Sequence, residues 1–154
     1  MKLNFVFLLL LTTAGAAMAQ GPICSEQKIR ELVQKESYHT TSDAFFWSGA
    51  YDRPLIGSAE IEKGNKEREA AAPRKNEGPA AQHPQKIEVS KSGDMAYEYG
   101  TGSLSFDSIK EKKHLAFELA YLRVWKAVDG ECRATAIMMH PIESTIKETP
   151  IQTK

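Results

Sequence analysis

The sequence lacks the short motifs that mark well-known classes of enzyme and metal protein. It contains no H-E-x-x-H, C-x-x-C, Walker or G-x-S-x-G pattern. Its four histidines, at positions 39, 83, 114 and 140, are too scattered to form a metal site evident from spacing. No N-x-S/T glycosylation sequon occurs either. We therefore expect no metal and no other cofactor.

Long hydrophobic runs are also missing. The longest, Phe5–Leu11, is far shorter than the roughly 20 apolar residues that cross a bilayer. Lys2 precedes it, and Ala17–Ala19 follows it with the small residues of an A-x-A cleavage site. This arrangement is typical of an export signal. We expect residues 1–19 to be removed and the protein to be secreted or periplasmic, with no membrane attachment afterwards.

Neither sign of charge is in excess. The 154 residues include 20 Lys and Arg against 20 Asp and Glu, so the formal net charge is zero. Nucleic-acid binders and proteins held on anionic membranes concentrate positive charge, so neither partner is expected. The length predicts one domain, which we place at 25–142, after a lead at 20–24 and before a tail at 143–154.

Cysteine is scarce as well. Cys24 and Cys132 are too few for a scaffold built from disulfides and are not spaced as a metal site. An oxidising compartment permits one bridge between them. Two unpaired thiols are the alternative, and the sequence leaves the choice open.

The N-terminal half predicts helices. Ser25 is a plausible N-cap, and apolar residues at helical spacing predict an amphipathic helix over 26–37. Residues 42–49 contain three consecutive aromatics and end in glycine, which predicts a short strand and a turn. The polar, charge-rich stretch that follows predicts a solvated helix over 59–72 and then a loose loop up to residue 86.

The C-terminal half predicts strands over 86–90, 95–106, 114–128 and 132–140. Asp129-Gly130 is a strong signal for a two-residue type I′ hairpin. The two middle strands are long enough that they must coil, and Gly100 and Gly102 are candidate positions for a bulge or kink. These features predict an α+β fold in which a curved antiparallel sheet forms a half-barrel around the helices.

Strand alternation suggests a site. Glu98, Glu118 and His140 each share a strand face with apolar residues, an unusual setting for an ionisable group. If those three faces are the concave one, the three side chains converge in an apolar cup and can move a proton. The opposite parity, which includes Arg123 and Trp125, could equally line the core. A single bulge would switch part of the assignment, so this choice stays open.

Three stretches resemble a known family: Asp43–Ala50, Ser92–Gly100 (SGDMAYEYG) and Tyr121–Gly130 (YLRVWKAVDG). They are similar to SnoaL-like domains, in particular the group catalogued as domain of unknown function 4440 within the nuclear transport factor 2-like superfamily. The resemblance covers roughly residues 25–142. It departs from the family pattern at Cys132, where the family usually has tryptophan.

The resemblance implies a cone-shaped fold, a pocket at its open end and frequent dimerisation through the sheet. The superfamily includes isomerases, cyclases, dehydratases and non-catalytic binding modules. We therefore expect an exported protein that binds a small apolar ligand, with acid–base chemistry as an open question; the alternative is a non-catalytic binding or dimerisation module. The candidate catalytic residues are Glu98, Glu118 and His140. The candidate ligand-binding residues are Trp47, Tyr51, Asp43 and Met138.

Overall fold

The computed structural model describes residues 21–36, 38–78 and 81–151, so the expected export signal lies outside the described residues. The helices are α1 (Glu26–Gln34), α2 (Ser58–Ala71) and the 3-10 helix η1 (Glu143–Thr145). The strands are β1 (Thr40–Ser48), β2 (Leu55–Ile56), β3 (Arg74–Lys75), β4 (Ala81–Val89), β5 (Met95–Ser108), β6 (Lys113–Val128), β7 (Glu131–Pro141) and β8 (Lys147–Pro150). None of the described helices is long and apolar enough to cross a membrane.

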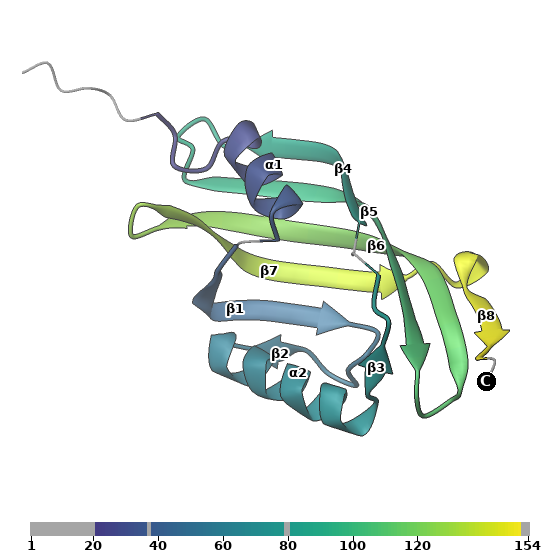
Figure 1. The fold of residues 1–154 in the computed structure, drawn as a ribbon. Helices are drawn as coiled ribbons and strands as arrows, with labels where there is room; N and C mark the ends of the chain where they lie inside the picture. Colours follow the sequence, from purple (N-terminus) through teal and green to yellow (C-terminus); the bar gives the residue numbers. More distant parts are fainter. Residues whose placement is uncertain (1–20, 37, 79–80, 152–154) are drawn as a thin grey trace, which may run out of the picture.

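All the strands join one sheet in the order β2-β1-β7-β6-β5-β3, with β4 also paired to β5 and β8 also paired to β6 (Figure 1). Every pairing is antiparallel except that of β1 with β7. Asp129 and Gly130 both have positive φ and connect β6 to β7 as the predicted type I′ turn.

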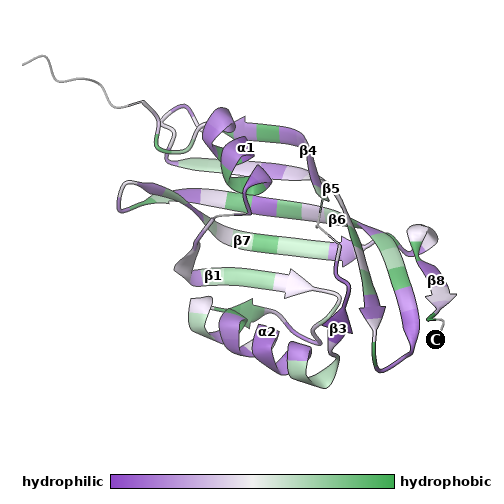
Figure 2. Ribbon diagram, viewed as in Figure 1, coloured by the Kyte–Doolittle hydropathy of each residue, from purple (hydrophilic) through white to green (hydrophobic). Residues whose placement is uncertain are grey.

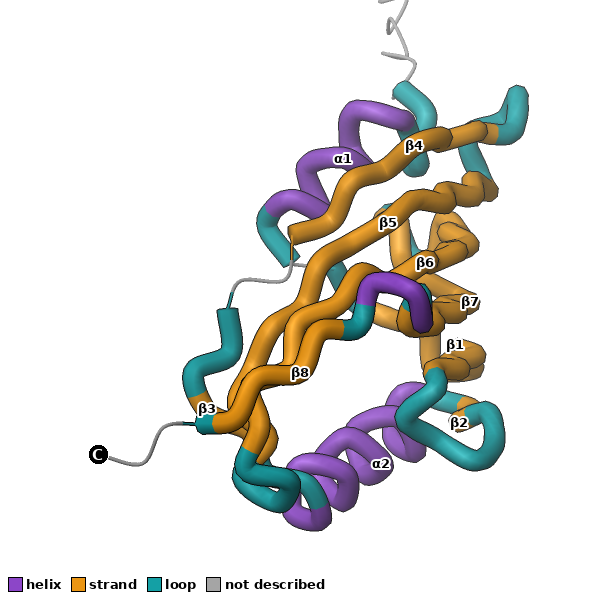
Figure 3. Tube along the Cα trace, turned by 90° about the vertical axis from the view of Figure 1, so that its right-hand side faces the viewer, coloured by secondary structure: helices purple, strands orange, loops and turns teal. Residues whose placement is uncertain are grey.

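The long strands β5 and β6 give the sheet its cone shape. They pair without a register shift along their whole length, while different strands flank them at the two ends. Figure 3 shows both strands bending between these ends. The predicted α+β half-barrel is thus confirmed. The sequence predicted a bulge or kink at Gly100 or Gly102. The bulge lies in the partner strand β4, between Pro84 and Lys86, opposite Gly100 and Tyr99 of β5.

Gly100 lies where β4 approaches β5 most tightly beside that bulge. A Cβ atom at this position would lie 2.2 Å from the carbonyl oxygen of His83 on β4 and 2.9 Å from the hydroxyl of Tyr121. Its lack of a side chain therefore lets β4 pair closely with β5 at this position.

Helix α1 covers the β4 end of the sheet (Figure 1). The Ser25 hydroxyl caps it by accepting a hydrogen bond of 3.2 Å from the backbone N–H of Lys28. Its apolar residues Ile29 and Val33 are buried in the main core, which also contains Trp125. The predicted helix continued to residue 37, whereas α1 ends at Gln34.

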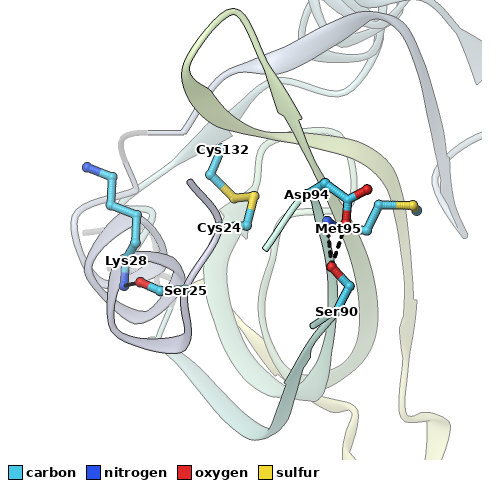
Figure 4. The surroundings of a disulfide bond; sticks show 7 residues. All are labelled: Cys24, Ser25, Lys28, Ser90, Asp94, Met95 and Cys132. Atoms are coloured by element: carbon cyan, nitrogen blue, oxygen red, sulfur yellow. Dashed lines mark hydrogen bonds between the residues drawn. A yellow bond between two sulfur atoms is a disulfide. The ribbon is translucent and has the colours of Figure 1, made fainter. Parts of the chain in front are cut away.

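A disulfide joins Cys24, just before α1, to Cys132 on β7 (Figure 4). The two Cα atoms are 5.1 Å apart, within the normal range. The backbone N–H of Cys24 also donates a 3.0 Å hydrogen bond to the carbonyl of Gly93, in the turn between β4 and β5. The start of α1 is therefore attached both to β7 and to the turn between β4 and β5.

Helix α2 is the predicted solvated helix, and hydrophilic residues predominate along it (Figure 2). It contacts β1 and β2 through Gly64, where a Cβ atom would lie only 2.6 Å from a methyl carbon of Leu55. The loop expected after it instead contains β3 and most of β4. The segment expected as a tail contains η1 and β8, and β8 extends the sheet beside β6.

Candidate functional site

The structure does not bring Glu98, Glu118 and His140 together. In the register of β5 with β6, Glu98 is opposite Arg123, and both side chains are buried. The inward face of β6 is therefore the one that includes Arg123 and Trp125, which was the alternative assignment. Glu118 is exposed on the outer face. His140 pairs with Ala120 and shares that outer face. The prediction that the three side chains converge in one concave cup is therefore wrong.

A bulge in β7 explains part of this correction. The register of β6 with β7 shifts between Val124 and Trp125, so the buried face of β7 changes from even-numbered to odd-numbered residues. Ala134 consequently points inward, whereas Met138 and His140 point outward. The alternation had assigned all of them to one face.

Four of the predicted residues do meet, in a groove on the outer face. Trp47, Tyr51, Met138 and His140 line this groove, which has a volume of about 560 Å³. The Nδ1 atom of His140 lies 2.9 Å from the backbone carbonyl of Pro141. Asp43 is exposed on β1 and lines no part of the groove.

Glu98 forms an ion pair inside the protein. It is fully buried and accepts a hydrogen bond from the Nη1 atom of Arg123, whose side chain is 1% exposed. Nη2 of the same guanidinium donates to the side-chain oxygen of Gln82 on β4. The rings of Tyr38 and Tyr121 lie against the guanidinium, each with its centroid 4.8 Å from the Cζ atom. Arg123 is thus held by an acid, an amide and aromatic faces.

The surroundings of this pair oppose charge. Burial raises the pKa of the Glu98 carboxyl, and the attraction of Arg123 only partly offsets that effect. Burial also raises the pKa of Tyr121, to about 12, with a further contribution from the Glu98 charge. Within the described part of the chain, Oε2 of Glu98 has no hydrogen-bond partner. Since Glu98 and Arg123 are closed off from solvent, we interpret the pair as structural.

The concave side contains a separate cavity of about 180 Å³. It lies between α2 and the sheet, and its apolar walls come from β1, β5, β6 and β7. The apolar residues are Phe46, Leu104, Phe117, Leu119, Met139 and Pro141. Among the described residues that line it there is no aspartate, glutamate or histidine. The described lining therefore offers neither a carboxylate nor an imidazole as a general acid or base, and Tyr51 is its one phenol.

The polar part of the cavity comes from the middle of the chain. Asn65 and Arg68 are on α2, and Arg74 is on β3. Tyr51 also lines the cavity, and its hydroxyl donates a 2.6 Å hydrogen bond to the side-chain oxygen of Asn65. Of these polar residues the sequence indicated only Tyr51, because the charge-rich pattern of α2 predicts a helix exposed to solvent. Pro73 was the one local sign of a turn that could bring Arg74 back to the sheet.

No group of three or more metal-ligating side chains is found in the ranges that the structure describes. No protein-family model matches the sequence, and no curated protein matches it. Solved structures do match, at low sequence identity. A hexachlorocyclohexane dehydrochlorinase from Novosphingobium barchaimii is 10% identical, with a TM-score of 0.55 over 80% of this chain and 86% of its own. A ketosteroid isomerase-like protein from Erwinia carotovora is 13% identical, with a TM-score of 0.55 over 74% and 81%.

A third match is a type 2 hexachlorocyclohexane dehydrochlorinase (LinA), 12% identical, with a TM-score of 0.54 over 83% of this chain and 87% of its own. The protein has the nuclear transport factor 2-like fold. Identities this low establish the fold alone, since one fold hosts many activities. The fold expected from the SGDMAYEYG and YLRVWKAVDG stretches is therefore confirmed.

Proposed function

We propose that this protein binds a small, largely apolar molecule in the cavity between α2 and the sheet. The observation that carries the proposal is the lining: six apolar residues from four strands surround a space of about 180 Å³. An apolar cavity of about 150 Å³ is large enough to bind benzene. The ligand is therefore about the size of one ring or a short alkyl chain.

The proposal is one of binding, without acid–base chemistry by the three residues that the sequence suggested. Glu98 is closed off in its ion pair, and Glu118 and His140 lie on the other face of the sheet. The dehydrochlorinase and the ketosteroid isomerase-like protein share the fold, but identities of 10% and 13% carry no activity over to this chain. We also propose that the protein is exported, which suits its single disulfide.

The binding proposal can be tested with a neutral single-ring probe, 2-phenylethanol, followed by NMR and calorimetry. Leu104→Trp places a large ring in the cavity and should abolish binding, because Leu104 is one of its walls. The matched control is Leu122→Trp, which fills the outer groove instead. Loss of binding in Leu122→Trp alone would move the site to the outer face and contradict the proposal.

A second candidate function, dimerisation through the sheet, is favoured by the outer face. Trp47 pairs with Met138, Met138 with Leu122, and Leu122 with Tyr99, so four apolar side chains form a continuous row across β1, β7, β6 and β5. Each is between 38% and 46% exposed. An exposed, uncharged row of this kind suits the same row of a second copy across a twofold axis. Sedimentation should show a dimer that Leu122→Asp converts to a monomer.

A further inference from the structure

The cavity has an apolar body and a cationic end, and the cationic end is not explained by the fold. Arg68 and Arg74 both line it, although they come from different elements. Two guanidinium groups at one cavity repel each other unless an anion lies between or beside them. The question is whether acids of the protein itself already neutralise them.

Arg74 is held in place by contacts that leave most of its charge available. Its Cζ atom lies 3.9 Å from the centroid of the Phe106 ring, so the guanidinium plane is supported from the core side. Its acidic partner is Glu77, at 3.5 Å between Nη1 and Oε1, and the Glu77 side chain is 53% exposed. A single long contact to a solvated glutamate is a weak ion pair. The Arg74 side chain itself is only 23% exposed.

Arg68 forms no ion pair with any residue in the described ranges, although i,i+4 pairs connect other charges of the same helix. Burial lowers the pKa of Arg74, and repulsion from the Arg68 charge lowers it further. The two guanidinium charges are therefore close enough to repel each other. Among the described residues, the only ion pair formed by either arginine is that of Arg74 with Glu77.

The neighbouring amide adds a third donor. Because the side-chain oxygen of Asn65 accepts the hydrogen bond from Tyr51, its amide nitrogen remains available to donate. Arg68, Arg74 and Asn65 thus present only donors to the cavity. Such a set recognises the oxygens of an anion, and the planar fork of arginine matches a carboxylate.

We propose that the ligand is a small monocarboxylate, an aromatic or short-chain acid, whose carboxylate binds Arg68 and Arg74 while its apolar body lies against Leu104 and Phe117. The inference rests on the proposed function, because it assigns the polar end of the same cavity. It goes further by naming the chemical class of the ligand and the residues that select it.

The test compares two probes with the same ring: phenylacetate, which carries the carboxylate, and 2-phenylethanol, which replaces it with a neutral hydroxyl. Calorimetry at neutral pH and low salt should show phenylacetate binding at least about tenfold more tightly, as expected for a charge-assisted contact. Arg68→Gln and Arg74→Gln should each remove most of that preference and leave 2-phenylethanol binding nearly unchanged. Arg133→Gln is the matched control, since Arg133 is similarly half-buried but pairs with Glu131 away from the cavity.

The outcomes separate the two proposals. Equal affinity for the two probes, unaffected by the arginine variants, would overturn the carboxylate inference and leave the apolar cavity as the binding site. Binding of neither probe would overturn both. A preference for phenylacetate that Arg133→Gln removes as well would show general attraction to positive charge and would also overturn the inference. Circular dichroism of each variant confirms that a loss of binding is not a loss of folding.

Discussion

The two ends of the cone differ in how their arginine charges are neutralised. Under α1, the guanidinium of Arg123 is enclosed with Glu98, an amide and aromatic rings, and the core around it is filled. Beside α2, Arg68 and Arg74 line a cavity, and the nearest acidic partner is a solvated glutamate. A fully buried charge must be paired inside the protein, whereas a charge that lines a cavity can be neutralised by a bound ligand. This difference separates the structural end from the candidate binding end.

The end of the cone under α1 should depend strongly on the disulfide. The bridge joins residues 108 positions apart, so the chain-entropy model predicts a loss of about 5 kcal/mol in the free energy of unfolding for Cys24→Ser with Cys132→Ser. Urea denaturation measures this directly. Binding of 2-phenylethanol near α2 should change little if the double variant is measured below its transition. A loss of binding without unfolding would show that the two ends are coupled.

Removing one member of the buried pair should also be costly. Glu98→Gln leaves the Arg123 charge enclosed without its acid, and we expect about 3 kcal/mol of destabilisation. The double variant Glu98→Leu with Arg123→Met removes both charges and should recover most of that loss, because burial already disfavours the Glu98 charge. If Glu98→Gln were as stable as the unmodified protein, the structural interpretation of the pair would be wrong.

Alkaline pH should weaken the closed end before the open one. The pKa of Tyr121 is raised from 10.0 to about 12, so above pH 10 the unfolded chain releases this proton while the folded protein keeps it. This contribution to folding stability is fully present below pH 10 and is lost as the pH rises toward about 12, by roughly 3 kcal/mol at most. Thermal denaturation across this range, compared with Tyr121→Phe, isolates the effect. The same slope in both proteins would exclude Tyr121 as its source.

The open end should show the smallest effect on stability. Arg68→Gln removes a charge that repels Arg74 and has no ion-pair partner in the described ranges, so the change should be within about 0.5 kcal/mol and slightly stabilising. Chemical denaturation with and without phenylacetate measures both consequences in one experiment. A large destabilisation would instead identify Arg68 as a structural residue, like Arg123.

Local patterns predicted much of the fold. The Ser25 cap, the polar α2, the Asp129-Gly130 turn and the long final strands are encoded by neighbouring residues, so they were legible along the chain. The parallel pairing of β1 with β7 was not, because it joins segments about 90 residues apart. The short strands β2, β3 and β8 were missed for a different reason: two to four residues carry almost no periodic signal.

The candidate site shows the same division. Alternation along the strand was enough to predict that Glu98 shares a face with apolar residues, and the two cysteines left a Cys24–Cys132 bridge as one of two possibilities. Tertiary structure decided which parity faces inward, since a bulge in β7 placed His140 outside and the register of β5 with β6 placed Arg123 against Glu98. It also brought Arg68 and Arg74 to one cavity. Alternation of side chains along a strand shows which residues share a face, but the face that is buried depends on how the sheet packs against the helices.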